Sequence, residues 1–155
     1  MKLKRTLLVI GLIIVIGIGV YCVTQNTPAK KNDRILAGLL NDFTDAISTL
    51  SQAKIVETKG ICGKLYGNGN GMQYFGAVLV KQDSINDVTA LLEQLDQMFE
   101  IVAVAAQEDN EIESKCLEHQ SLRFDTTVSD GTQYVSVWFF NSSHPDSDLR
   151  DIRGH

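Results

Sequence analysis

The uncharged apolar run Leu7–Val23 constrains this chain more than any other sequence feature. As an α-helix the run would extend roughly 25 Å, close to the thickness of the hydrocarbon core of a bilayer. Basic residues, which stay on the cytosolic side of membranes, stand immediately before it at Lys2, Lys4 and Arg5. We therefore expect residues 1–6 to be cytosolic and residues 7–23 to be a single-pass anchor in membrane lipid. The remainder is then extracytoplasmic.

A cleaved signal peptide is the alternative interpretation of this run. Signal peptides have an apolar stretch of roughly 7–15 residues followed by a small-x-small cleavage site. Thr27-Pro28-Ala29 offers a poor version of that site. Because the run is longer than a typical signal peptide, an uncleaved anchor is the preferred interpretation.

The rest of the chain has the length and composition of one globular domain. The full chain has 155 residues, of which 44% are hydrophobic and 21% charged, values typical of folded proteins. We expect a linker at residues 24–32, an α+β domain at residues 33–141 and a polar flexible tail at residues 142–155, which contains Pro145.

Two segments have the spacing of amphipathic helices. Apolar residues recur every three or four positions between Ile35 and Leu50, which predicts a helix over Asp33–Ala53. A second apolar stripe extends from Ile85 to Leu95. At its start, Ser84 and Asp87 form a pair that resembles a capping box. We expect both helices to pack on a sheet.

Two strands are predicted on either side of a glycine-rich turn. Ile55–Tyr66 and Met72–Lys81 flank Gly67–Gly71, whose Asn-Gly pairs suit a tight hairpin. A phosphate-binding loop would instead open a helix. The sequence therefore predicts a β-hairpin at this position.

The third predicted strand, Phe99–Ala106, has apolar residues at both odd and even positions. This pattern is typical of a strand that is covered on both faces. The helix before it would connect it to Met72–Lys81 as a crossover between parallel strands. Gln107–Glu118 is acidic and is expected to form a short helix or a loop. Leu122–Ser129 and Gln133–Asn141 flank Asp130-Gly131, which predicts a second hairpin.

The predicted fold class is therefore α+β, with a two-layer mixed β-sheet packed by two main helices. The element order is α-β-β-α-β-(α)-β-β after one transmembrane helix. The predicted domain resembles ferredoxin-like and cystatin-like folds only in this order of elements. Such a resemblance implies nothing about function.

The charge of the domain argues against nucleic-acid binding. The chain has 14 basic and 19 acidic residues, and three of the basic ones precede the apolar run. The remainder has a net charge of about −8, which repels phosphate backbones.

Cys62 and Cys116 are the cysteines outside the apolar run, and in an oxidising compartment they either form a disulfide or remain two unpaired thiols. Cys116 and His119 are three residues apart, but a structural zinc site requires four ligands. The acidic neighbours Glu113 and Glu118 disfavour a reactive thiolate.

The sequence contains no recognisable catalytic motif, so we expect a protein that is not an enzyme. Asp146, Asp148 and Asp151 lack the glycine and glutamate positions of a calcium-binding EF-hand loop. We therefore predict no catalytic, cofactor-binding or metal-binding residues and no cofactor.

The last predicted strand carries the candidate binding site. Tyr134, Trp138 and Phe140 share one face of the strand, and exposed aromatic patches often mark protein interfaces. We therefore expect an envelope protein that binds another protein. The alternatives are a module that binds a small ligand or a cell-envelope polymer in a cleft between sheet and helices and, less favoured, a hydrolase with paired carboxylates.

Overall fold

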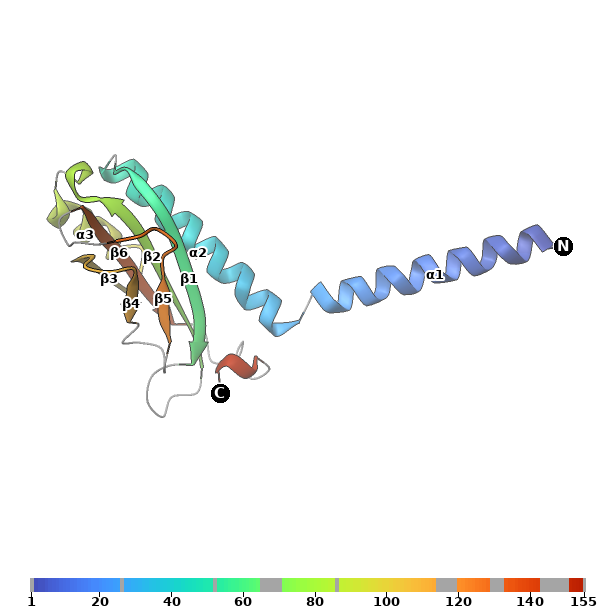
Figure 1. Ribbon diagram of the computed structural model, residues 1–155. Coiled ribbons are helices and arrows are strands. Elements are labelled where there is room, and N and C mark those ends of the chain that lie inside the picture. The colour runs from blue at the N-terminus through green and yellow to red at the C-terminus, as the bar shows by residue number, and fades with distance from the viewer. Residues whose placement is uncertain are drawn as a thin grey trace.

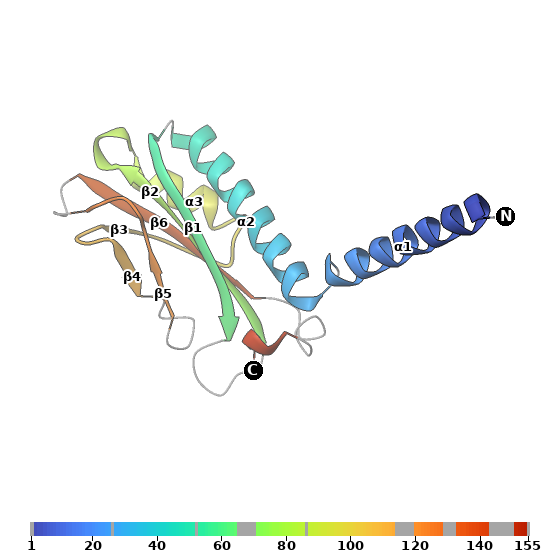
Figure 2. The ribbon, with the colours of Figure 1, turned by 45° about the vertical axis from the view of Figure 1, so that its right-hand side comes forward.

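A computed structural model describes residues 2–25, 27–51, 53–64, 71–85, 87–113, 120–128, 133–142 and 151–154. A four-stranded sheet is covered by two helices on one face and by a short hairpin on the other, while α1 projects away (Figures 1 and 2). The elements are α1 Lys2–Gln25, α2 Pro28–Ser51, β1 Ile55–Lys64, β2 Met72–Lys81, η1 Gln82–Ser84, α3 Val88–Leu95, β3 Ile101–Ala106, β4 Glu111–Glu113, β5 Ser121–Arg123, β6 Tyr134–Ser142 and η3 Ile152–Gly154.

The main sheet has the order β1-β2-β6-β3, and each neighbouring pair is antiparallel. The α+β class is thus confirmed, whereas the predicted mixed sheet is wrong. Strands β2 and β3 do run in the same direction, but β6 lies between them and pairs with both. The prediction failed because periodicity reveals strands without revealing which strand inserts between two others.

The first predicted hairpin is confirmed, because β1 and β2 pair from Lys64↔Met72 onward. Its turn at residues 65–70 lies outside the described residues. The second predicted hairpin is wrong: β6 pairs with β2 and β3, while β5 pairs with β4. Of the described residues of the predicted strand Leu122–Ser129, only Leu122 and Arg123 belong to a strand, β5. Part of the acidic segment expected to be a helix or loop forms β4 instead.

Helix α2 begins earlier than the sequence predicted. It starts at Pro28 rather than Asp33, so most of the expected linker forms its first turn. Pro28 suits the first helical position because its fixed φ is helical and no N–H is lost there. The Thr27 hydroxyl accepts a hydrogen bond from the Lys30 N–H at 3.3 Å, which caps this end.

Helix α3 is capped by Asp87, whose carboxylate accepts the Ala90 N–H at 3.0 Å. The capping-box prediction at Ser84 is therefore wrong. The Ser84 hydroxyl instead accepts the Lys54 N–H at 2.8 Å, tying η1 to the segment before β1.

The larger core lies between the sheet and helices α2 and α3. Phe43 of α2 meets Phe99 and Phe139 with ring centroids 4.8 and 4.7 Å away. These rings fill the space between the sheet and the helices, where the alternative ligand-binding cleft would lie. Helix α2 approaches the strands closely at Gly60 and Gly76, which pair across β1 and β2 beneath Leu40.

A second core lies on the opposite face of the sheet. Phe75, Ala77, Leu79 and Phe140 are covered there by Leu122, Phe124 and Val128. This explains why residues 120–128 do not extend the sheet: their alternating apolar side chains pack on its second face.

The end of the chain docks on the start of α2. Asp151, with 1% of its surface exposed, accepts hydrogen bonds from Asn32 at 2.8 Å and from Arg153 at 2.7 Å. Tyr74 donates to the same Asn32 at 2.9 Å. The hydrogen bond from Arg153 lowers the pKa of Asp151 to about 2; burial opposes this and Asn32 supports it. Residues 151–154 are thus not a loose tail, while residues 143–150 lie outside the described residues.

Between Ile10 and Val23 helix α1 is apolar on every side, and its large side chains there are 49–72% exposed. Taken singly, none of the described helices meets the length and apolarity expected of a membrane span. Ile10–Thr24 and Pro28–Ser51 meet those criteria only as a pair, with a bend of 61° between them.

Candidate functional site

The three aromatic residues singled out from the sequence do not form one open patch. Phe140 is only 7% exposed because the segment after β5 covers it, and Tyr134 and Trp138 are half-buried. The Trp138 ring lies 5.6 Å from the Phe75 ring, centroid to centroid. Of the three, Trp138 lines a cavity.

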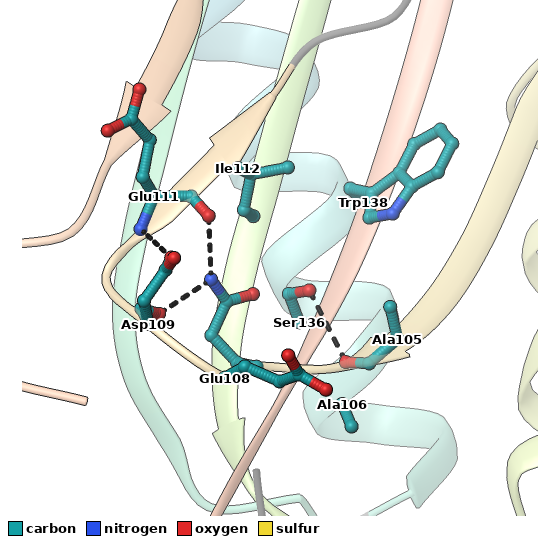
Figure 3. Close-up of a pocket in the computed structure, with 9 residues that line it drawn as sticks. Ala105, Ala106, Glu108, Asp109, Glu111, Ile112, Ser136 and Trp138 are labelled. Atoms are coloured by element: carbon teal, nitrogen blue, oxygen red, sulfur yellow. Dashed lines mark hydrogen bonds between the residues drawn. The ribbon is translucent and has the colours of Figure 1, made fainter. Parts of the chain in front are cut away.

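This cavity has a volume of about 290 Å³ and lies where β3 ends (Figure 3). Its walls include Ala105 of β3, Ile112 of β4, and Ser136 and Trp138 of β6. Figure 3 shows Ile112 and the Trp138 indole on opposite sides of it. We call these residues, together with Ala103, Ala106 and Glu108, the β3–Trp138 surface.

A buried glutamine shapes the turn that closes the cavity. The Gln107 side-chain amide donates to the carbonyl of Asp109 at 2.8 Å and to that of Glu111 at 3.1 Å. The Asp109 carboxylate accepts the Glu111 N–H at 2.8 Å. These bonds pair polar groups within the turn. Ile112 of β4 packs against the second core.

The cavity is acidic, and none of the described residues that line it is basic. Glu108, Asp109 and Glu111 contribute to its wall. Figure 3 shows the Glu108 carboxylate extending toward Ala106, whereas the Glu111 carboxylate points away from the cavity. The three carboxylates therefore do not converge on one point.

In the part of the chain that the structure describes, strand β3 forms an edge of the sheet beside this cavity. Gln107 donates its N–H to the Tyr134 carbonyl at 3.0 Å. Because antiparallel strands exchange backbone bonds at every second residue pair, Ala103 and Ala105 also direct their bonds to β6. The backbone groups of Val102, Val104 and Ala106 therefore face away from β6.

The sequence predicted that β3 would be covered on both faces, and the structure corrects this. Ala105 and Ala106 are exposed, and Val102, Ala103 and Val104 are half-buried. An apolar pattern typical of a central strand thus lies at an edge. The sequence did not predict this surface, because Glu108 and Ile112 lie in the segment that was expected to form a helix or a loop. The change from an apolar strand to an acidic turn was the signal that could have indicated it.

Cys62 is buried on the face of β1 toward α2. Its sulfur lies 4.0 Å from Asp33 Oδ1, and burial raises the pKa of the thiol. Such a thiol is poorly reactive. Cys116 and His119 lie outside the described residues, so the disulfide with Cys62 and the cysteine–histidine pair stay predictions.

Among the described residues, no three His, Cys, Asp or Glu side chains are grouped so that they could hold a metal ion. Of the aspartates weighed for a calcium loop, Asp151 is engaged by Asn32 and Arg153. Asp146 and Asp148 lie outside the described part of the chain.

Comparisons with models of protein families, with curated proteins and with solved structures give no match to this chain.

Proposed function

We propose that this chain is a membrane-anchored interaction protein whose extracytoplasmic domain binds another protein through the β3–Trp138 surface. The observation that carries this proposal is the half-buried Trp138, which lines a cavity directly beside an open sheet edge. Tryptophans in such settings are frequent energetic centres of protein interfaces, because they bury a large area and keep an N–H for a partner.

The anchoring part of the proposal is supported by α1. Its described apolar side chains between Ile10 and Val23 surround the helix and are largely exposed. A helix that is apolar on all sides is stable when protein or lipid surrounds it. Lys2, Lys4 and Arg5 favour a cytosolic N-terminus.

The other functions considered from the sequence receive less support. The cleft between sheet and helices is filled by the rings of Phe43, Phe99 and Phe139, which argues against a ligand there. Hydrolysis would need two converging carboxylates, and Glu108 and Glu111 point in different directions (Figure 3).

Site-specific photo-crosslinking in native membranes tests the proposal. A photoreactive residue at exposed Ala105 should capture a discrete protein, whereas the same residue at exposed Glu93 on α3 should not. Trp138→Ser should reduce the Ala105 adduct several-fold while the protein still accumulates in the membrane. Phe140 is unsuitable for this test, because a polar residue there would disrupt the second core.

Equal capture from positions 105 and 93, or none from either, would remove the β3–Trp138 surface as the binding site.

A further inference from the structure

We infer that the partner supplies an extended segment that pairs with β3 as a fifth strand and places a basic side chain in the Trp138 cavity. This inference rests on the proposed function and specifies the chemistry of its partner. It is carried by three features of the β3–Trp138 surface: outward-facing backbone groups, small side chains next to a cavity, and negative charge.

The first feature is that β3, an edge strand among the described residues, lacks the usual protection. Natural edge strands are guarded by Lys, Pro, bulges or inward charges, because their open backbone groups attract other strands. The sequence of β3 is Ile-Val-Ala-Val-Ala-Ala, with no charge and no proline. Its pairing with β6 is regular from Ile101 to Ala106, with no bulge. Val102, Val104 and Ala106 therefore offer alternate N–H and C=O groups to an added strand.

The second feature is the space above Ala103 and Ala105, which alternate with the residues whose backbone groups face outward. Ala103 and Ala105 pair with Trp138 and Ser136, so they point to the same face of the sheet as these residues. A side chain of an added strand opposite Ala105 would point to this face too. Since alanine is small, a long side chain could cross it and reach the cavity.

The third feature selects a basic side chain. Glu108 reaches toward Ala106 at the cavity, and Asp109 and Glu111 lie on the same turn (Figure 3). An arginine stem would pack over Ala105, with its guanidinium between the Glu108 carboxylate and the Trp138 ring. Both an ion pair and a cation–π contact favour that position.

A second copy of this chain fits the edge less well. Antiparallel self-pairing centred on Val104 would place Glu100 of each copy opposite Glu108 of the other. Like charges directly opposite each other destabilise a strand pair. The acidic residues that flank β3, Glu100 and Glu108, thus favour a partner segment with basic residues over self-association.

Peptide binding to the full-length chain in detergent micelles tests this inference. The probe is a synthetic hexapeptide of alternating valine and threonine with one central arginine, and its matched control has glutamate in place of arginine. Trp138 is the single tryptophan of the chain, so its emission reports on the site directly. We expect a saturable emission change with the arginine peptide and at least about tenfold weaker binding of the glutamate peptide.

Backbone pairing is tested separately by amide hydrogen exchange and by proline substitution. Bound peptide should slow exchange at Val102, Val104 and Ala106. Ala106→Pro removes an outward N–H and should weaken peptide binding about fivefold or more, whereas Ala106→Ser keeps the N–H and should bind normally. Thermal unfolding of both variants checks that the sheet with β6 is intact.

The outcomes separate this inference from the proposed function. If Ala105 captures a protein but the peptide neither changes Trp138 emission nor slows exchange at β3, strand addition is wrong and the proposed function stands. Equal binding of both peptides overturns the basic side chain. Dimers in which the same amides are protected without peptide overturn the inference in favour of self-pairing.

Discussion

Glu57 fastens the loop after β5 to the edge strand β1. Its carboxylate accepts the N–H groups of Asp125 and Thr126, both at 2.9 Å, and the Thr126 hydroxyl at 2.7 Å. Lys59 adds an ion pair at 3.3 Å. One half-buried carboxylate thus holds the segment that covers the second core.

These contacts make stability depend on pH. Burial raises the pKa of Glu57, but the hydrogen bonds from Asp125 and Thr126, together with Lys59, outweigh it and lower the pKa to about 2 from an ordinary 4.5. Because the folded pKa is depressed, the stabilisation is complete above pH 4.5 and is lost as the pH falls toward 2.

We predict that Glu57→Gln lowers the free energy of unfolding by about 1 to 3 kcal/mol at pH 7, the usual cost of losing hydrogen bonds to a charged group. The difference from wild type should shrink below pH 4.5 and vanish near pH 2. Urea unfolding followed by Trp138 emission measures it, with Glu93→Gln as the exposed control. A difference that is constant between pH 7 and pH 3 would contradict this account.

At the level of residues, the sequence shows which side chains are present but not which of them meet in the fold. Glu57 and Thr126 are far apart in the chain, and nothing in either local pattern indicates that they meet. Trp138 was identified because strand alternation placed it on a face with Tyr134. Its cavity could not be predicted, because the opposite wall comes from Ile112 of β4.

At the scale of elements, the approach of α2 to the sheet depends on paired glycines. A Cβ on Gly76 would lie 2.7 Å from Leu40 Cδ2 and even closer to the Phe139 ring, and a Cβ on Gly60 would lie 2.6 Å from Leu40 Cδ1. The absence of side chains at these two positions therefore lets Leu40 rest on the strands.

We predict that Gly76→Ala destabilises the protein by about 1 to 3 kcal/mol, because Leu40 and Phe139 must both move. Gly38→Ala on α2 is the matched control: its Cβ meets nothing within 4 Å, and alanine favours a helix over glycine by about 1 kcal/mol. Thermal unfolding distinguishes the two variants. Equal melting temperatures for Gly76→Ala and wild type would show that α2 tolerates a longer distance.

Local patterns predicted most elements, and β2 was predicted at its observed bounds. The stripe in α2 was clear because one face meets the core. The strand order was not predictable, since an antiparallel sheet with β6 inserted has the same local periodicity as a parallel crossover. The β4–β5 hairpin was missed because three-residue strands leave almost no alternation to detect.

At the scale of the whole molecule, the proposed anchor places the folded domain outside the cytosol. We predict that a membrane-impermeant maleimide labels Glu93→Cys in intact cells, in a background with Cys22 and Cys116 changed to serine. Cys62, being buried, should stay unlabelled and serves as the internal control. Lys4→Cys should be labelled only after permeabilisation. The reverse pattern would contradict both the anchor orientation and the proposed partner.

The position of β6 in the sheet has a consequence for how this protein is made. Among the described strands, β6, which joins β2 to β3, is the last one synthesised, because it follows all the others in the chain. Until it emerges, β3 lacks its only described neighbour and the apolar sequence Ile101–Ala106 stays unpaired. Segments of this kind aggregate readily in incomplete chains. Nascent chains stalled before Tyr134 should therefore need a chaperone, whereas finished chains should not.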